Sequence, residues 1–333
     1  MLKDIPGTEL CPLVDDHKFP ILVQAEDRQT DLLEWARANR ENIIGMIRDC
    51  AAVLLRNFNL KDRSTFTEFV QLISQPQIYN YRSTPRNNLG NNLYTASEYP
   101  PAHTIPLHCE NAYQRDWPMR LFFYCEQPAA VGGETPLACV NTITHELHSD
   151  IKNEFIKKKI MYVRNYHPGL DLPWQTVFQT DSRNEVECYC EANGIACEWI
   201  DGNQLRTRQI CGAVAKHPDT KELLWFNQAH LFHVTSLDEK TRNALLTVYS
   251  EEQLPRNALY GDGTPIEHEY LQHIHNTFNE NKIFFEWQKG DILILDNMLV
   301  AHGRNPYCGD RNVLVMMGDS YSSWAVDKQS DED

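Results

Sequence analysis

Three side chains in the sequence could together hold a metal ion. His108 and Glu110 stand two positions apart in the run PLHCEN. Residues two apart in a β-strand point to the same side, so an imidazole nitrogen and a carboxylate oxygen would project together while Cys109 faces away. His302 follows an apolar run, 292–295, and is expected in the loop after that strand, where functional groups are often displayed. Two histidines and one carboxylate form the facial triad of non-haem Fe(II) oxygenases, which leaves further coordination positions open.

Two weaker features follow the H-x-E segment. The turn Gly132-Gly133-Glu134-Thr135 by itself is typical of a plain turn, because glycine adopts positive φ at little cost. Arg311 opens a predicted strand nine positions after His302 and by itself could be a surface arginine. An H-x-E triplet also occurs by chance in many chains. The order of all four features is what favours a functional site.

Other histidines and cysteines give weaker metal signals. The histidines of THELHSD are three apart, whereas the zinc-protease motif H-E-x-x-H needs four. Three more lie on a predicted amphipathic helix and are expected to be solvated. A cysteine cluster lacks the paired C-x2-C of structural zinc sites. The residues set aside on these grounds are His145, His148, His268, His273, His275, Cys188, Cys190 and Cys197.

Composition limits the classes of partner. The chain has 333 residues, with 42% hydrophobic and 23% charged, which is typical of a globular protein. Its formal net charge of −15 argues against nucleic acid and anionic membrane surfaces. No apolar run reaches the roughly 18 residues of a membrane span. The N-terminus lacks a signal-peptide pattern, and the ten cysteines read as free thiols, so a cytoplasmic location is expected.

Hydrophobic periodicity predicts helices in the first third of the chain and short strands from Tyr94 onward. Helices are expected at 31–48, after a cap at Asp62 or Ser64, and as inserts at 141–158, 236–250 and 265–279. Strands are expected at 51–58, 121–126, 283–285, 291–296 and 312–317. The pattern predicts a mostly β fold with α insertions, as one domain over 1–325 with a flexible acidic tail at 326–333. Trp117, Trp225 and Trp287 are expected in the core.

Taken together, these motifs resemble the taurine dioxygenase/TfdA-like family of Fe(II)- and 2-oxoglutarate-dependent oxygenases. Within it, the sequence is most similar to the SyrP-like and clavaminate-synthase-like branch, which acts on amino acids or peptidyl amino acids. The resemblance extends from about Tyr81 to Asp319. The stretches that carry it include IPLHCENAY, WPMRLFFYCEQPA, VGGETPLA, WFNQAHLFH and WQKGDILILDNMLVAHGRNPYCGDRNVLVMMGD.

The resemblance implies a role for each matching residue. His108, Glu110 and His302 would be the ligands of Fe(II). Arg311 would bind the distal carboxylate of 2-oxoglutarate, with help from the hydroxyl of Thr135, because a guanidinium fork pairs well with a carboxylate. Arg304 is the alternative anchor. The family fold is a double-stranded β-helix, or jelly roll, flanked here by helices.

Two positions narrow the chemistry that the resemblance implies. A second arginine, which binds the acidic group of the substrate in taurine dioxygenase-like enzymes, is replaced by Val315, so taurine is not the expected substrate. Related halogenases have a small residue in place of the carboxylate ligand, and Glu110 fills that place here. Hydroxylation, desaturation or oxidative cyclisation is therefore favoured over halogenation.

The predicted activity is hydroxylation of an unactivated C–H bond in an amino acid or amino-acid-derived substrate, free or tethered to a carrier protein, in specialised metabolism. O2 is the second cosubstrate. Desaturation or cyclisation on the same iron is one alternative, and a non-catalytic jelly-roll binding or regulatory protein is another. Each candidate substrate contact could also be a surface residue or a partner of buried backbone. The candidates are Arg82 and Arg86 for a carboxylate, Asn227 and Gln228 for an amino or amide group, and Asp262 and Glu267 for an ammonium.

Overall fold

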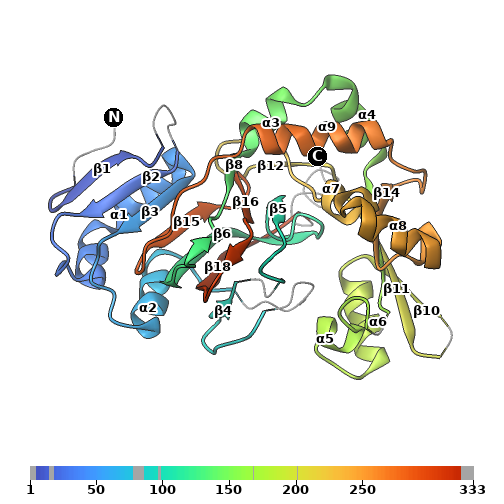
Figure 1. Cartoon of the computed structure of the whole chain (residues 1–333), viewed down its shortest axis with the longest axis horizontal. Coiled ribbons are helices and arrows are strands. Elements are labelled where there is room, and N and C mark those ends of the chain that lie inside the picture. The colour runs from blue at the N-terminus through green and yellow to red at the C-terminus, as the bar shows by residue number, and fades with distance from the viewer. Residues whose placement is uncertain are drawn as a thin grey trace, which may run out of the picture.

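The largest sheet contains strands from both ends of the chain. The computed structural model describes residues 5–14, 19–77, 86–96, 99–167, 169–200 and 202–323. Seven strands lie in the order β1-β2-β3-β15-β6-β18-β4, all antiparallel except β2 and β3, which run parallel (Figure 1). Their bounds are β1 Thr8–Pro12, β2 Ile21–Ala25, β3 Ala52–Arg56, β4 Tyr94–Thr95, β6 Asp116–Gln127, β15 Ile292–Asp296 and β18 Asn312–Ser322.

The central strands of this sheet are apolar on both faces because both faces are covered. Helices α1 (Leu32–Cys50) and α2 (Arg63–Ile73) cover one face. Phe66 of α2 is buried there with Phe122 and Ile294 of the sheet. This explains why β6 and β15 read as continuous hydrophobic runs and not as an alternating pattern.

A smaller sheet covers the other face. It consists of β5 (Ile105–His108), β16 (Val300–Arg304) and β8 (Leu137–Cys139), in the order β5-β16-β8. Phe123 and Leu295 of the main sheet share one apolar cluster with residues of all three strands. A two-stranded pair, β7 (Val131–Gly132) with β17 (Tyr307–Cys308), lies beside the GGET turn. The mostly β architecture with helices is confirmed, and the jelly-roll assignment stays a prediction.

A third group of elements was not predicted from the sequence. A four-stranded sheet in the order β10-β11-β9-β14 is accompanied by short helices and lies apart from the main sheet (Figure 1). Its strands are β9 Ile160–Asn165, β10 Ile195–Ile200, β11 Gln204–Cys211 and β14 Arg256–Tyr260.

The remaining elements, predicted and unpredicted, are α3 Val140–Glu146, α4 Ser149–Lys158, α5 Trp174–Phe178, α6 Arg183–Ala192, β12 Val214–Lys216, β13 Leu223–Trp225, α7 Ala229–Phe232, η1 Val234–Ser236, α8 Glu239–Val248, η2 Glu251–Gln253 and α9 His268–Glu280.

Most predicted helices are confirmed. Asp31 and Asp62 cap α1 and α2 by accepting hydrogen bonds from backbone N–H groups of the first turn. The predicted insert 141–158 is two helices, because the chain leaves helical geometry at Leu147 and His148. The predicted strand 283–285 is wrong. Ile283 forms only an isolated bridge, and the side chain of Phe284 is 54% exposed.

Three further expectations concern burial and surface. Trp117, Trp225 and Trp287 are buried, as predicted, in the apolar cluster that the main sheet shares with the smaller sheet. Among the helices in the described part of the chain, none has the length and apolar composition to cross a bilayer. The acidic tail at 326–333 lies outside the described residues.

The cover of the main sheet by α2 can be tested at Phe66. Phe66 is fully buried and its ring lies 5.3 Å from that of Tyr124. We expect Phe66→Ala to lower the free energy of unfolding by about 3–5 kcal/mol, because it leaves a cavity in the core. Phe284→Ala, at an exposed position, should change it by less than about 0.5 kcal/mol. Urea denaturation measures both, and equal effects would contradict this packing.

Candidate metal centre and cosubstrate pocket

The pairing of β5 with β16 brings the two histidines together. His302 lies directly opposite His108 in the antiparallel register, and their ring centroids are 4.6 Å apart. Gly303 permits this approach, since a Cβ there would lie 2.5 Å from the carbonyl oxygen of Ile105. His302 is therefore part of a buried strand and not of a loop as predicted.

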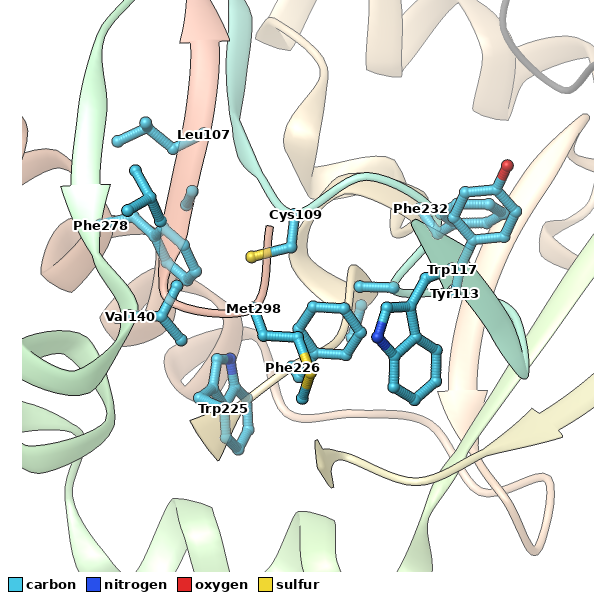
Figure 2. Packing of buried hydrophobic residues seen from close by; sticks show 14 of the residues in the cluster. Leu107, Cys109, Tyr113, Trp117, Val140, Trp225, Phe226, Phe232, Phe278 and Met298 are labelled. Carbon is cyan, nitrogen blue, oxygen red and sulfur yellow. The ribbon is translucent and has the colours of Figure 1, made fainter. Parts of the chain in front are cut away.

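Glu110 reaches the histidines from just beyond the end of β5. The strand ends at His108, so the expected strand alternation does not extend to Glu110. The side chain of Cys109 points into the apolar cluster near Val140 and Met298 (Figure 2). Glu110 Oε2 lies 3.9 Å from Nε2 of His108 and 3.9 Å from Nε2 of His302. The three donors thus converge as predicted, although through a turn.

The histidines have the protonation state that metal ligation needs. Nδ1 of His108 donates a hydrogen bond to the carbonyl oxygen of Pro106 at 2.8 Å, which leaves the Nε2 lone pair facing Glu110. Burial lowers the pKa of His108, and burial together with the nearby His108 and Arg86 lowers the pKa of His302. Both rings are therefore neutral at neutral pH. Within the described ranges, these are the only three side chains of metal-ligand type whose donor atoms lie within 4.8 Å of one another. Two imidazoles and one carboxylate fit Fe(II).

Arg86 contacts the carboxylate of this cluster. Its Nη2 donates to Oε2 of Glu110 at 2.8 Å, and the two side chains are 4% and 5% exposed. The guanidinium offsets the negative charge of a carboxylate that is shielded from water. Arg86, a predicted substrate contact, therefore lies within the site.

Beside the histidines lies a pocket that contains the predicted cosubstrate anchor. Nε of Arg311 donates to the carbonyl oxygen of Gly133 at 3.0 Å, so Nη1 and Nη2 are the atoms left to bind a ligand. Gly133 has a φ of 77°, which favours glycine, and a Cβ there would press on Arg311. Burial, and secondarily the charge of Arg304, lowers the pKa of Arg311 to about 10, and the guanidinium stays charged at neutral pH. The pocket is lined by Arg86, Ala96, Ile105, His108, Phe123, Thr135, His302, Gly303, Arg304, Arg311 and Val313.

Thr135 is buried in the same pocket with its hydroxyl oriented by a tryptophan. Nε1 of Trp287 donates to Oγ1 of Thr135 at 3.0 Å. The oxygen is thus used as an acceptor, and its proton is available to a ligand carboxylate. The sequence predicts Trp287 only as a core residue. Nothing in the run WQKGD around it indicates the hydrogen bond to Thr135.

Arg304 has a different set of partners. Its terminal nitrogens donate to the carbonyl oxygens of Tyr99, Pro100 and His103 at 2.7–2.8 Å. It therefore holds the segment before β5 in place. These contacts favour Arg311 over Arg304 as the cosubstrate anchor.

The other predicted substrate contacts in the described part of the chain do not line this pocket. The amide of Asn227 is bonded to backbone groups on both sides, as the alternative interpretation expected. Nε2 of Gln228 donates to the carbonyl oxygen of Cys109 at 2.6 Å, next to Glu110. Asp262 lies in an exposed turn, where it accepts hydrogen bonds from Thr264, and Glu267 accepts one from Tyr260. Arg82 lies outside the described residues.

The chain matches a known family over most of its length. The match covers residues 15–317 and the family is described as taurine catabolism dioxygenase TauD, TfdA family. The dapdiamide synthesis protein DdaC of Enterobacter agglomerans is 39% identical over 92% of this chain and 93% of its own. A clavaminate synthase-like protein of Arabidopsis thaliana is 26% identical over 84% of this chain and 85% of its own.

Solved structures show the same fold. PvcB, an Fe, alpha-ketoglutarate dependent oxygenase from an isonitrile synthetic pathway, superposes with a TM-score of 0.56 at 15% identity, over 96% of this chain and 93% of that one. The chain belongs to the TauD/TfdA family. It is a 2-oxoglutarate-dependent non-haem iron dioxygenase, with Fe(II) as cofactor and 2-oxoglutarate and O2 as cosubstrates.

The metal cluster can be tested by binding. We expect the anaerobic apoprotein to bind one equivalent of Fe(II), measured by titration calorimetry. His302→Ala should weaken binding by about 100-fold or more, because loss of an outer-shell partner alone costs 10–100-fold. His145→Ala, at an exposed histidine on α3, should leave the affinity unchanged. Stoichiometric Fe(II) at full affinity in His302→Ala would show that the ion binds elsewhere.

Proposed function

We propose that this enzyme hydroxylates an unactivated C–H bond of an amino acid or amino-acid-derived substrate in specialised metabolism, with His108, Glu110 and His302 as the iron ligands. The observation that carries the proposal is the convergence of these donors beside a pocket that contains the half-buried guanidinium of Arg311 and the buried hydroxyl of Thr135. When bound, Fe(II) with 2-oxoglutarate and O2 supplies the oxidising power that removes hydrogen from carbon.

In this proposal the chain binds and orients the cosubstrate. The guanidinium of Arg311 pairs with the distal carboxylate of 2-oxoglutarate, and the hydroxyl of Thr135 donates to the same group. Support comes from the charge of Arg311, its fixed Nε and the hydrogen bond from Trp287 to Thr135. Phe123, whose ring lies 5.2 Å from that of His302, helps to exclude water from the reacting centre.

Arg86 is the best-supported contact for a substrate carboxylate. It is the arginine nearest to Glu110 in the described part of the pocket, and a carboxylate group is common to amino acids. Gln228 supports the backbone beside Glu110, and Asn227 and Asp262 receive no support from their contacts.

Support for specialised metabolism comes from relatives. One is named for dapdiamide synthesis and a structural neighbour for an isonitrile pathway. The cytoplasmic location belongs to the same proposal and is supported by the ten cysteines, which form no disulfide with one another. Whether the substrate is free or attached to a carrier protein is an outcome of the test below.

The function is tested with the Fe(II)-loaded enzyme. Succinate release is measured across the free amino acids and across carrier-bound aminoacyl thioesters, followed by product mass. We expect substrate-dependent succinate and a product one oxygen atom heavier. A product two hydrogens lighter would replace hydroxylation with desaturation or cyclisation. Succinate release that no amino acid or thioester stimulates would overturn the substrate class.

The cosubstrate anchor gives a separate prediction. We expect Arg311→Ala to raise the KM for 2-oxoglutarate about 30-fold or more, since truncating one partner of a buried charge pair costs at least about 2 kcal/mol. Thr135→Val should raise it less, because a neutral hydrogen bond is weaker.

Arg304→Ala is the matched control in the same pocket. It should lower the midpoint of urea unfolding, because three carbonyl groups lose their donor, and change the KM by only a few-fold. A large rise in KM for Arg304→Ala alone would move the anchor to Arg304.

A further inference from the structure

Asn297 lies at the turn between β15 and β16 and is completely buried. Its side-chain amide bonds to both backbone polar groups of Glu110. Oδ1 accepts from the N–H of Glu110 at 2.7 Å, and Nδ2 donates to the carbonyl oxygen of Glu110 at 2.9 Å. Nδ2 also donates to the carbonyl oxygen of Pro118 in β6 at 2.8 Å. One side chain thus ties the backbone of Glu110 to the main sheet.

Only an amide satisfies this set of partners. The site presents one N–H donor and two carbonyl acceptors, so the occupying side chain must accept once and donate twice. A carboxylate of the same shape would accept from the N–H but would face two carbonyl oxygens without a proton to give. The need for an amide at position 297 therefore comes from the backbone groups of Glu110 and Pro118 that it bonds.

The turn itself is held by separate contacts. The backbone N–H of Asn297 donates to Met119 in β6, at 2.9 Å. Oδ1 of Asp296 accepts from the N–H groups of Met298 and Leu299, and Oδ2 pairs with Nε2 of His217 at 3.1 Å. These bonds fix the turn, and they leave the amide of Asn297 for Glu110.

We infer that Asn297 is a positioning residue that holds Glu110 in place for the metal. This inference rests on the proposed role of Glu110 as a ligand. Glu110 lies beyond the end of β5, where the β5–β16 ladder no longer fixes the backbone. The side chain of Asn297 bonds the N–H and the carbonyl oxygen of Glu110, as a neighbouring strand would do in a sheet. His108 and His302 are held by the ladder, so among the three proposed ligands only Glu110 has its backbone bonded by Asn297.

The test compares two isosteric substitutions in the same buried turn. Asn297→Asp removes both donated bonds to carbonyl oxygens. Asp296→Asn changes the contact with His217 and leaves the hydrogen bonds between Asn297 and Glu110 in place. Affinity for Mn(II) is measured by titration calorimetry, and the urea midpoint of each apoprotein is measured alongside. We expect Asn297→Asp to weaken Mn(II) binding about 10–100-fold and Asp296→Asn to change it less than about threefold. Both variants should lose stability.

Asn297→Ala provides a second variant that removes the amide without adding charge, and it should also weaken binding about tenfold or more. Wild-type affinity in a folded Asn297→Asp or Asn297→Ala protein would overturn the inference. Equal losses in Asp296→Asn would do so too, because the effect would then follow stability. If neither Asn297 variant folds while Asp296→Asn does, Asn297 serves the whole fold and the inference fails. Absence of Mn(II) binding in the wild type, or full binding in His302→Ala, counts instead against the ligand assignment.

Discussion

The backbone pairing of β5 with β16 is the constraint on which the site depends. These strands are about two hundred positions apart in the chain, and their register places His302 opposite His108. Gly303 makes the approach possible because the carbonyl oxygen of Ile105 occupies the space of a Cβ. A shift by one residue would turn one histidine to the opposite face of the sheet. The opposite face carries apolar side chains that are buried in the core, and a slip by one residue would move them out of it, so burial fixes the register.

The apolar core supplies this rigidity. The main sheet is buried on both faces, by α1 and α2 on one side and by the small sheet on the other. Slippage of either sheet would expose several large side chains, and each costs about 1.5–3 kcal/mol when exposed. Figure 2 shows Cys109, the residue between His108 and Glu110, among side chains of the apolar cluster. The two candidate histidine ligands thus lie on strands that are packed against this core.

Hydrogen bonds from polar side chains hold the site residues that strand pairing does not fix. Glu110 lies past the last ladder pair and depends on the amide of Asn297, while Arg86 offsets its charge. On the cosubstrate side, Gly133 and Trp287 orient Arg311 and Thr135 in the same way. Arg304, the alternative anchor of the sequence analysis, donates hydrogen bonds to three carbonyl groups of the segment before β5.

The sequence by itself determined the chemistry. The motifs around His108, Glu110, His302 and Arg311 carry residue types that suit iron and a dicarboxylate, and capped amphipathic patterns located α1 and α2. Local patterns do not determine which strand pairs with which. They therefore do not predict the four-stranded sheet, and they wrongly predict a strand for the apolar run at 283–285. Only the tertiary structure decided that His302 lies inside a strand and that Arg304 bonds to the carbonyl groups of the segment before β5. It also revealed that Asn297 bonds to Glu110. These outcomes depend on contacts between residues far apart in the chain, and such contacts leave no periodicity in the sequence.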